Sequence, residues 1–195
     1  MITAINLSDF KVAEPAISEN AFKIHYEQHY LKYIKNAQEL TNKVPWKDVS
    51  SKDIIKVADV NHALHHNVAQ VYNHEFFFEQ FTSDPTKLEY CEELMEYYNG
   101  SIGSFKQIII EKSLELFGNG YLWVWLFKDT DMFVFNTYPN DQTPIKAFNN
   151  IIPILNIDLW EHSYYLDYQS DKKSYVENVL DRIDWKVIEN RLPPW

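Results

Sequence analysis

The sequence predicts an α+β fold: an N-terminal antiparallel helical hairpin, followed by an α/β lobe with a small, three-stranded antiparallel sheet. Apolar and aromatic residues recur at helical spacing in the first part of the chain. Three short apolar runs in the second part have the length of strands. The turn-forming sequence TSDP at residues 82–85 separates the two parts. We therefore predict a helical hairpin domain at residues 1–84 and a C-terminal α+β domain at residues 85–195.

The hairpin needs two long helices. The first is predicted at residues 21–44, where Ser18 and Asn20 are candidate N-caps and Pro45 would end the helix. The second is predicted at residues 59–81, up to the turn.

The second lobe mixes helices and strands. Two helices are predicted at residues 87–99 and 101–117. The runs YLWVWLF, MFVFNTY and IIPILNID then predict strands at residues 121–127, 132–138 and 151–158. A helix through residue 168 and a final helix at residues 174–189 complete the chain.

Composition excludes several classes of protein. The net charge of -10 argues against nucleic acid or an anionic membrane as a partner. One cysteine, Cys91, excludes a disulfide scaffold and a thiolate-rich zinc site, and is typical of a reduced, cytoplasmic setting. The N-terminal residues lack the basic and apolar regions of a signal peptide, and no apolar run is long enough to span a membrane.

Three histidines and one aspartate are candidate metal ligands: His25, His74, Asp158 and His162. Asp158 follows a run of Ile and Leu, where a carboxylate is costly unless it is paired or coordinated. Imidazoles and a carboxylate together suit a first-row transition metal. Taken alone, each histidine is more often a packed or surface residue, and Asp158 could simply orient His162.

Helical spacing adds further candidates. Gln70 lies four residues before His74, so both share one helix face. His29 and Tyr33 continue the face that begins at His25. A second group of histidines, at positions 62, 65 and 66, has no counterpart elsewhere in the sequence that would give it a role.

Four segments, HYEQHYLKY, AQVYNH, FGNGYLW and DLWEHSYYLDY, resemble the signature regions of the iron/manganese superoxide dismutases. The resemblance extends over nearly the whole chain, and the last segment is close to the specific D-x-W-E-H-x-Y-Y motif. It implies a homodimeric enzyme that converts superoxide to O2 and H2O2 with one Fe, or alternatively Mn, per chain.

The resemblance also implies a role for each candidate. The four candidate ligands would hold the metal, His29 and Tyr33 would control substrate entry, and Gln70 would tune the metal. The residues expected at the subunit contact or around the ligands are Glu161, Tyr165, Trp123 and Trp160.

The position of the tuning glutamine indicates the metal. Iron-type members carry it four residues before the ligand histidine, where this chain has Gln70. Manganese-type members take it from the loop after the sheet hairpin, where this chain has Asp141 followed by Gln142. Two tryptophans usual in the family are replaced by Tyr72 and Tyr121, whose hydroxyls need partners if they are buried.

Two other functions remain open on the sequence alone. The first is a non-haem iron enzyme such as an oxygenase, although such sites typically use two histidines and one carboxylate. The second is a metal-holding protein without turnover, which the changes at Tyr72 and Asp141 motivate. If superoxide is the substrate, local cations must attract it against the net charge, and Lys23, Lys32 and Arg191 are candidates.

Overall fold

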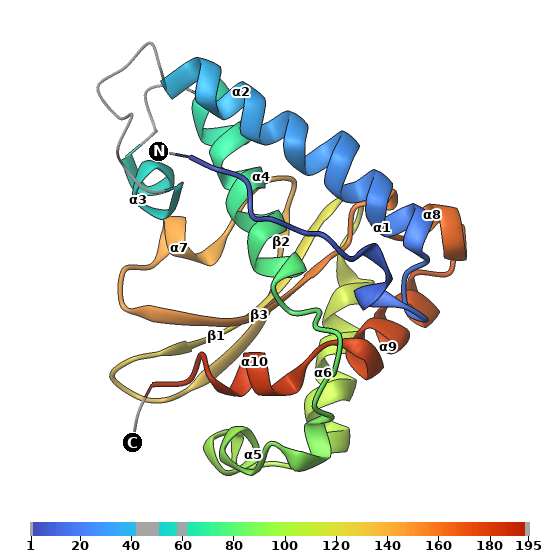
Figure 1. Ribbon diagram of the computed structural model, residues 1–195. Coiled ribbons are helices and arrows are strands. Elements are labelled where there is room, and N and C mark those ends of the chain that lie inside the picture. Colours follow the sequence, from blue (N-terminus) through green and yellow to red (C-terminus); the bar gives the residue numbers. More distant parts are fainter. Residues whose placement is uncertain (1, 42–50, 58–61, 194–195) are drawn as a thin grey trace.

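The computed structural model describes residues 2–41, 51–57 and 62–193. Its first part is the predicted helical hairpin (Figure 1). One arm consists of α1 (Glu19–Ile24), the π-helical stretch η2 (His25–Tyr30) and α2 (Leu31–Thr41), which follow one another without a break. The other arm, α4 (His62–Phe78), packs along α2. The predicted hairpin is confirmed.

Local chemistry explains how the first arm starts. The Ser18 hydroxyl accepts a hydrogen bond from the backbone N–H of Ala21 at 3.2 Å, so Ser18 is the N-cap and Asn20 lies inside the helix. The predicted stop at Pro45 lies outside the described residues. Two short helices not predicted from the sequence, η1 (Phe10–Ala13) and α3 (Ser51–Val57), accompany the hairpin.

The three predicted strands form one antiparallel sheet in the order β2-β1-β3. They are β1 (Gly120–Phe127), β2 (Phe133–Pro139) and β3 (Ile151–Asp158). The central strand β1 is buried along most of its length, as its apolar sequence predicts. The pairing of β1 with β3 places Tyr121 opposite Asp158, and paired residues point to the same face of a sheet.

The remaining helices are η4 (Leu88–Tyr90), α5 (Glu92–Tyr98), α6 (Ile102–Glu115), α7 (Pro144–Ala147), α8 (Glu161–Tyr168), α9 (Lys172–Arg182) and α10 (Trp185–Glu189). The single helix predicted at residues 174–189 is wrong, because the chain breaks into α9 and α10. Asp184 causes the break: it leaves helical geometry and accepts a hydrogen bond from the Lys186 N–H at 3.0 Å, capping α10. The helix predicted at residues 87–99 is likewise split into η4 and α5.

Packing between the two parts brings the end of β3 against the hairpin. Helix α4 contacts β3, while α6 contacts β1 and β2 and carries α9 on its other side (Figure 1). No helix in the described ranges is both long enough and apolar enough to cross a membrane. The strand that ends in Asp158 therefore meets the helices that carry the candidate histidines.

Candidate metal centre

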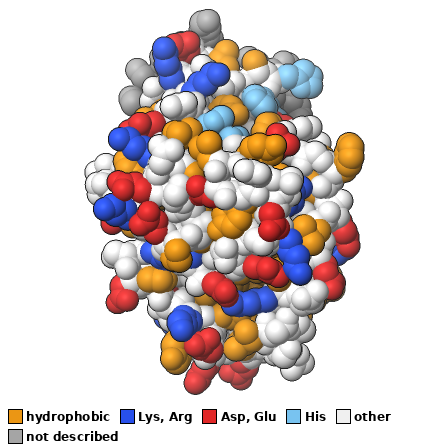
Figure 2. Space-filling model, turned by 90° about the vertical axis from the view of Figure 1, so that its right-hand side faces the viewer, with side chains coloured by type: hydrophobic (Ala, Val, Ile, Leu, Met, Phe, Trp, Pro, Cys, Tyr) orange, Lys and Arg blue, Asp and Glu red, His pale blue; other side chains and the backbone are white. Residues whose placement is uncertain are grey.

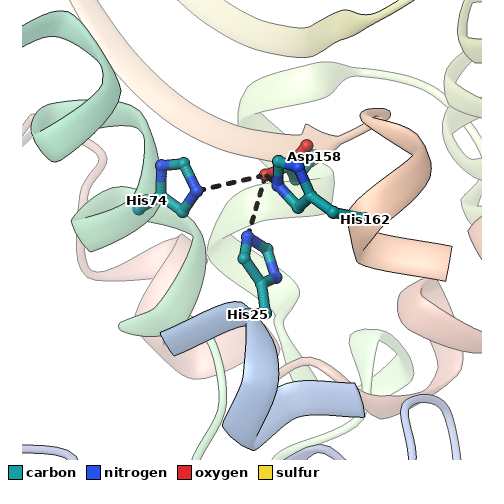
Figure 3. Close-up of side chains that lie close together, drawn as sticks. All are labelled: His25, His74, Asp158 and His162. Carbon is teal, nitrogen blue, oxygen red and sulfur yellow. Dashed lines mark ion pairs between the residues drawn. The ribbon is translucent and has the colours of Figure 1, made fainter. Parts of the chain in front are cut away.

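Four side chains from four different elements converge on one point (Figure 3). His25 begins η2, His74 lies in α4, Asp158 ends β3, and His162 lies in the first turn of α8. One nitrogen or oxygen from each residue lies within 4.8 Å of the corresponding atom of every other. The structure thus brings together all four residues that the sequence nominated as ligands.

Asp158 stands at the middle of the group. Its Oδ2 lies 3.2 Å from Nε2 of His25, 3.5 Å from Nε2 of His162 and 3.9 Å from Nε2 of His74. Its Oδ1 accepts a hydrogen bond from the backbone N–H of Trp160 at 2.9 Å. One carboxylate oxygen is therefore fixed by the backbone, and the other faces the three imidazoles.

Burial keeps the imidazoles of His25 and His74 neutral. Burial, opposed by the nearby Asp158 carboxylate, lowers the pKa of His25 to about 4. Burial and the neighbouring His25 lower the pKa of His74 well below its usual value. Although burial alone would raise the pKa of Asp158, its contacts with His162 and His25 hold it well below the usual range. Near pH 7 the site therefore offers the neutral imidazoles of His25 and His74 and the ionised carboxylate of Asp158.

The chemistry of these atoms fits a bound metal ion. Nε2 of each of the three histidines and Oδ2 of Asp158 are buried without a hydrogen-bond partner in the described structure. Leaving a buried polar atom unpaired costs roughly 1–3 kcal/mol, so four such atoms together require an explanation. A cation that accepts their lone pairs supplies it, and three imidazoles with one carboxylate suit a first-row transition metal.

Gln70 fixes which nitrogen of His74 is available. Nδ1 of His74 lies 2.7 Å from the backbone carbonyl of Gln70, so the Nδ1–H donates to this oxygen. The lone pair then remains on Nε2, which faces Asp158. Such a bond from the far nitrogen is how a protein usually orients a metal-binding imidazole.

His29 and Tyr33 lie beside the ligands. The ring of His29 stacks on that of His162, with 4.1 Å between centroids. Burial and the neighbouring imidazoles of His162 and His25, which disfavour a further positive charge, lower the pKa of His29 to about 4. Tyr33 lies 5.4 Å from the ring of His74, and burial together with Asp158 raises its pKa. Both rings therefore border the ligand group as neutral side chains near pH 7.

The side chain of Gln70 is fully buried, and Tyr121 holds it. The Tyr121 hydroxyl donates to Oε1 of Gln70 at 2.7 Å, which gives this buried hydroxyl the partner it requires. Tyr72, the other tyrosine that replaces a tryptophan, instead stacks on Trp123 with 5.8 Å between centroids. Of the two replaced positions, Tyr121 therefore lies beside a candidate ligand, His74, whereas Tyr72 packs against Trp123.

Asp141 is engaged elsewhere. Its Oδ2 lies 3.5 Å from Nδ1 of His66 and 3.9 Å from Nε2 of His65. These contacts give a role to two of the histidines for which the sequence offered none. Since positions 65 and 141 are far apart in the chain, no local pattern could have revealed the pairing.

The other four predicted residues take different places. Trp160 is half-buried, stacks on His162 at 5.6 Å and donates its indole N–H to the carbonyl of Asn140 at 3.2 Å. Trp123 is buried in the sheet. Glu161 and Tyr165 lie on the exposed side of α8, which Figure 1 shows at the right and Figure 2 turns toward the viewer. Trp160 thus borders the ligand group directly, whereas Glu161 and Tyr165 face outward.

Tyr175 also supports the site, although the sequence did not indicate it. Its hydroxyl donates to the backbone carbonyl of Asp158 at 2.8 Å, in a fully buried position. This bond ties α9 to the end of β3, where the carboxylate must be held. Helical spacing marks Tyr175 only as a core residue, so the sequence carried no separate signal for it.

Comparison with known proteins shows similarity along nearly the whole chain. The family models for the alpha-hairpin domain and the C-terminal domain of iron/manganese superoxide dismutases match residues 8–82 and 85–191. An iron superoxide dismutase of Bacteroides fragilis is 35% identical over 184 residues, which are 92% of each chain. One of Plasmodium falciparum is 32% identical over 181 residues, 91% of this chain and 89% of the relative. A manganese superoxide dismutase of Chlamydia trachomatis is 29% identical over 189 residues, 94% of this chain and 90% of the relative.

Proposed function

The chain belongs to the family of iron/manganese superoxide dismutases and catalyses the dismutation of superoxide to O2 and H2O2; we propose that His25, His74, Asp158 and His162 hold its single metal ion. The observation that carries this assignment is the convergence of four buried, otherwise unpaired ligand atoms within 4.8 Å of one another. A bound iron or manganese ion would supply the alternating one-electron oxidation and reduction that dismutation requires.

The surrounding residues orient ligands and handle protons. Forming H2O2 consumes protons that must come from solvent. Tyr33 and Gln70 are proposed to form the route for them, because Tyr33 is half-buried beside His74 while Gln70 is fully buried. His29 and Tyr33 are proposed to border the entry path, where their rings exclude larger molecules from the ligands.

Iron is the proposed metal. Gln70 lies on α4 one turn before the ligand His74, the position of the tuning glutamine in iron-type members. The competing position is Asp141, whose carboxylate pairs with His66 and His65. The Bacteroides and Plasmodium relatives named as iron enzymes support the same assignment, although the Chlamydia relative is named as a manganese enzyme.

An oxygenase is no longer a competing function. The family models and the iron superoxide dismutase relative match nearly the whole chain, and the family's reaction is superoxide dismutation. Two cavities of about 360 and 550 Å³ are lined by residues near Trp185 and near Tyr168, and neither is lined by the candidate ligands. A chamber for an organic substrate is therefore not offered by either cavity.

The decisive test measures superoxide turnover on protein whose iron and manganese have been quantified. His74→Ala and Asp158→Ala should each lose bound metal and at least about a hundredfold of the activity, since each removes a ligand from a buried site. His62→Ala is the matched control, because it removes an exposed histidine from the same helix. Full activity at wild-type metal content in either ligand variant would overturn the assignment.

The metal is tested on the same preparations. About one iron per chain, with activity lost in peroxide, would support the iron assignment. Turnover with manganese alone would overturn the iron assignment and make Gln142 the candidate tuning residue. A loaded metal without turnover would favour the metal-holding alternative.

We also propose a homodimer in the cytoplasm, built from a hairpin domain at residues 1–84 and an α+β domain at residues 85–195. Glu161 would reach a metal-binding histidine of the partner subunit, and Tyr165 would reach the partner's His29, which is proposed to border substrate entry. Their exposure on the helix that carries His162 supports this, as does the 52% exposure of Tyr165. The single cysteine supports a reducing compartment.

Sedimentation measurements test the dimer. Glu161→Ala should raise the dissociation constant about tenfold or more and lower the metal content, if the carboxylate reaches the other subunit. A monomeric wild-type protein would overturn this part of the proposal and leave the metal assignment untouched.

A further inference from the structure

His66 and Asp141 form a charged pair beside Tyr33, outside the group of candidate ligands. Nδ1 of His66 lies 3.5 Å from Oδ2 of Asp141. The ring of His66 meets the ring of Tyr33 edge to face, with 5.9 Å between centroids and 79° between planes. Tyr33 in turn lies 5.4 Å from the ring of His74. The pair is therefore separated from a proposed ligand by one side chain, the one that is proposed to border substrate entry.

Amide contacts hold the backbone on which the pair is built. His66 lies on α4, which packs against α2. Its neighbour Asn67 accepts a hydrogen bond at 3.0 Å from Nδ2 of Asn36 on α2. The backbone carbonyl of Asp141 accepts one at 3.2 Å from Nδ2 of Asn73 on α4. Both arms of the hairpin and the loop after β2 are thus joined close to the pair, which fixes where its charges lie.

The net charge of the pair depends on the protonation of His66. Asp141 raises the pKa of His66 against the effect of burial. While His66 is protonated the pair is neutral, and once His66 loses its proton the pair carries the charge of the carboxylate alone. The side chain of His66 is the more exposed of the two, at 44% against 18% for Asp141. An anion that approaches from solvent therefore meets the imidazole before the carboxylate.

The other titratable groups around His66 act on it less directly than Asp141 does. Tyr33 faces His66 from α2 and is uncharged near pH 7, because burial raises its pKa. His65 lies on the same helix, with Nε2 3.9 Å from the same carboxylate oxygen. Of the further elements that pack against α4, η2 and β3 carry the candidate ligands His25 and Asp158. Helix α3 also packs there, and its charged residues are exposed and open to screening by salt: Lys52, Asp53 and Lys56.

We propose that His66 is a residue of the entry path, where its imidazolium cancels the charge of Asp141 and so lets the superoxide anion pass Tyr33 without local repulsion. The inference rests on the proposed function, because it assumes an anionic substrate that enters beside Tyr33. His66 contacts none of the candidate ligands in this scheme and acts on the rate of encounter. An uncompensated carboxylate at the same place would add to the repulsion from a net charge of -10.

His66→Gln in the metal-loaded protein tests the proposal, because it leaves the carboxylate of Asp141 without its cation. At pH 5.5 and low salt we expect kcat/KM to fall roughly two- to fivefold, the effect of one unit charge at about 6–10 Å, while kcat is unchanged. As the pH rises through the raised pKa of His66, the wild type acquires the same negative charge. The ratio of variant to wild type should therefore approach one by pH 8.5, and it should also approach one as salt is added.

Asp141→Asn separates the charge of the pair from its shape. Since it removes the carboxylate, kcat/KM at low salt should rise roughly two- to fivefold at both pH values. A protein with both His66→Gln and Asp141→Asn has a neutral pair at every pH, so its kcat/KM at pH 5.5 should return to the wild-type value. Lys112→Gln is the matched control, because it leaves Glu115 without its cation on α6, which packs against the sheet and α9. It should leave kcat/KM unchanged.

Azide supplies a second readout, since it is an anion of the same charge and its binding needs no turnover. The rate at which azide binds to the metal-loaded protein, followed by absorbance, should change in the same direction as kcat/KM in each variant. An unchanged kcat/KM in His66→Gln at pH 5.5, or a double variant as slow as His66→Gln, would overturn the inference. If the wild type holds metal but does not consume superoxide, the proposed function fails, while the azide rates still decide the role of His66.

Discussion

The carboxylate of Asp141 is paired with neighbouring histidines and is therefore not available to a metal centre. The sequence places it where a tuning glutamine occurs in manganese-type members, but its Oδ2 pairs with His66 and His65 on α4. Burial alone would raise the pKa of Asp141, and the hydrogen bond and charge of His66 together with His65 lower it. The contact with Asp141 raises the pKa of His66 against the effect of burial.

These opposite shifts predict how the pair stabilises the fold with pH. The contribution of His66 is complete below its unfolded pKa of about 6.5 and is lost as the pH rises through its raised folded pKa. The contribution of Asp141 is present above its unfolded pKa of about 3.9 and is lost as the pH falls through its lowered folded pKa. The His66–Asp141 pair should therefore stabilise the folded state most at about pH 4 to 6.5.

His66→Gln tests this window. We expect a loss of about 0.2–1 kcal/mol in the free energy of unfolding at pH 5.5, the range for a partly exposed ion pair, and a smaller loss at pH 8.5. Denaturant titrations at the two pH values measure it, with His62→Gln as a control on the same helix. A loss that is equal at both pH values would show that the pair contributes packing rather than charge.

At the scale of elements, Asp184, which lies at the break between α9 and α10, connects the two parts of the chain. Asp184 caps α10, and it also accepts hydrogen bonds from the Thr82 hydroxyl at 2.8 Å and the Thr86 N–H at 3.1 Å. Thr82 and Thr86 flank the turn that connects the hairpin to the second lobe. A carboxylate that caps a helix and binds this connection explains why one predicted helix became two.

Asp184→Ala should therefore destabilise the fold more than the loss of an ordinary helix cap does. We expect the free energy of unfolding to fall by about 2–4 kcal/mol, because one cap is removed and two further donors lose their acceptor. Asp171→Ala is the matched control: Asp171 caps α9 at an exposed position and should cost about 1 kcal/mol. Equal losses in urea titrations of the two variants would contradict the linking role of Asp184.

At the scale of the whole molecule, the net negative charge repels the anionic substrate. With a net charge of -10, the chain repels a superoxide anion on average. Figure 2 shows Lys and Arg mixed with Asp and Glu over one face, without a continuous field of either sign. Arg191 is not an exposed steering cation, because its guanidinium stacks 3.7 Å from the Phe76 ring and donates to the carbonyl of Ile154 at 2.9 Å. Lys23 lies 4.0 Å from Glu27, which leaves exposed Lys32, whose charge acts on His29, as the stronger candidate.

Steering by Lys32 is tested by ionic strength. We expect kcat/KM to fall as salt is added, and Lys32→Gln to lower kcat/KM roughly twofold at low salt, the effect of one charge at about 10 Å in water. Lys112→Gln, which removes a lysine paired with Glu115 on α6, is the control. A salt dependence that is flat or rises in the wild type would reject steering.

The sequence alone determined the fold class and the three strands, because helical and strand periodicity is local. It pointed to the four residues that meet at the centre through the resemblance of their segments to the family's signature regions, and Asp158 stood out because a carboxylate after an apolar strand is costly unless it is paired or coordinated. Tertiary structure alone decided which polar groups those residues meet. The bond from Tyr121 to Gln70 spans 51 positions, and those from Asp184 to Thr82 and Thr86 span 102 and 98. Contacts over such separations depend on how helices pack on the sheet, and no pattern of neighbouring residues encodes them.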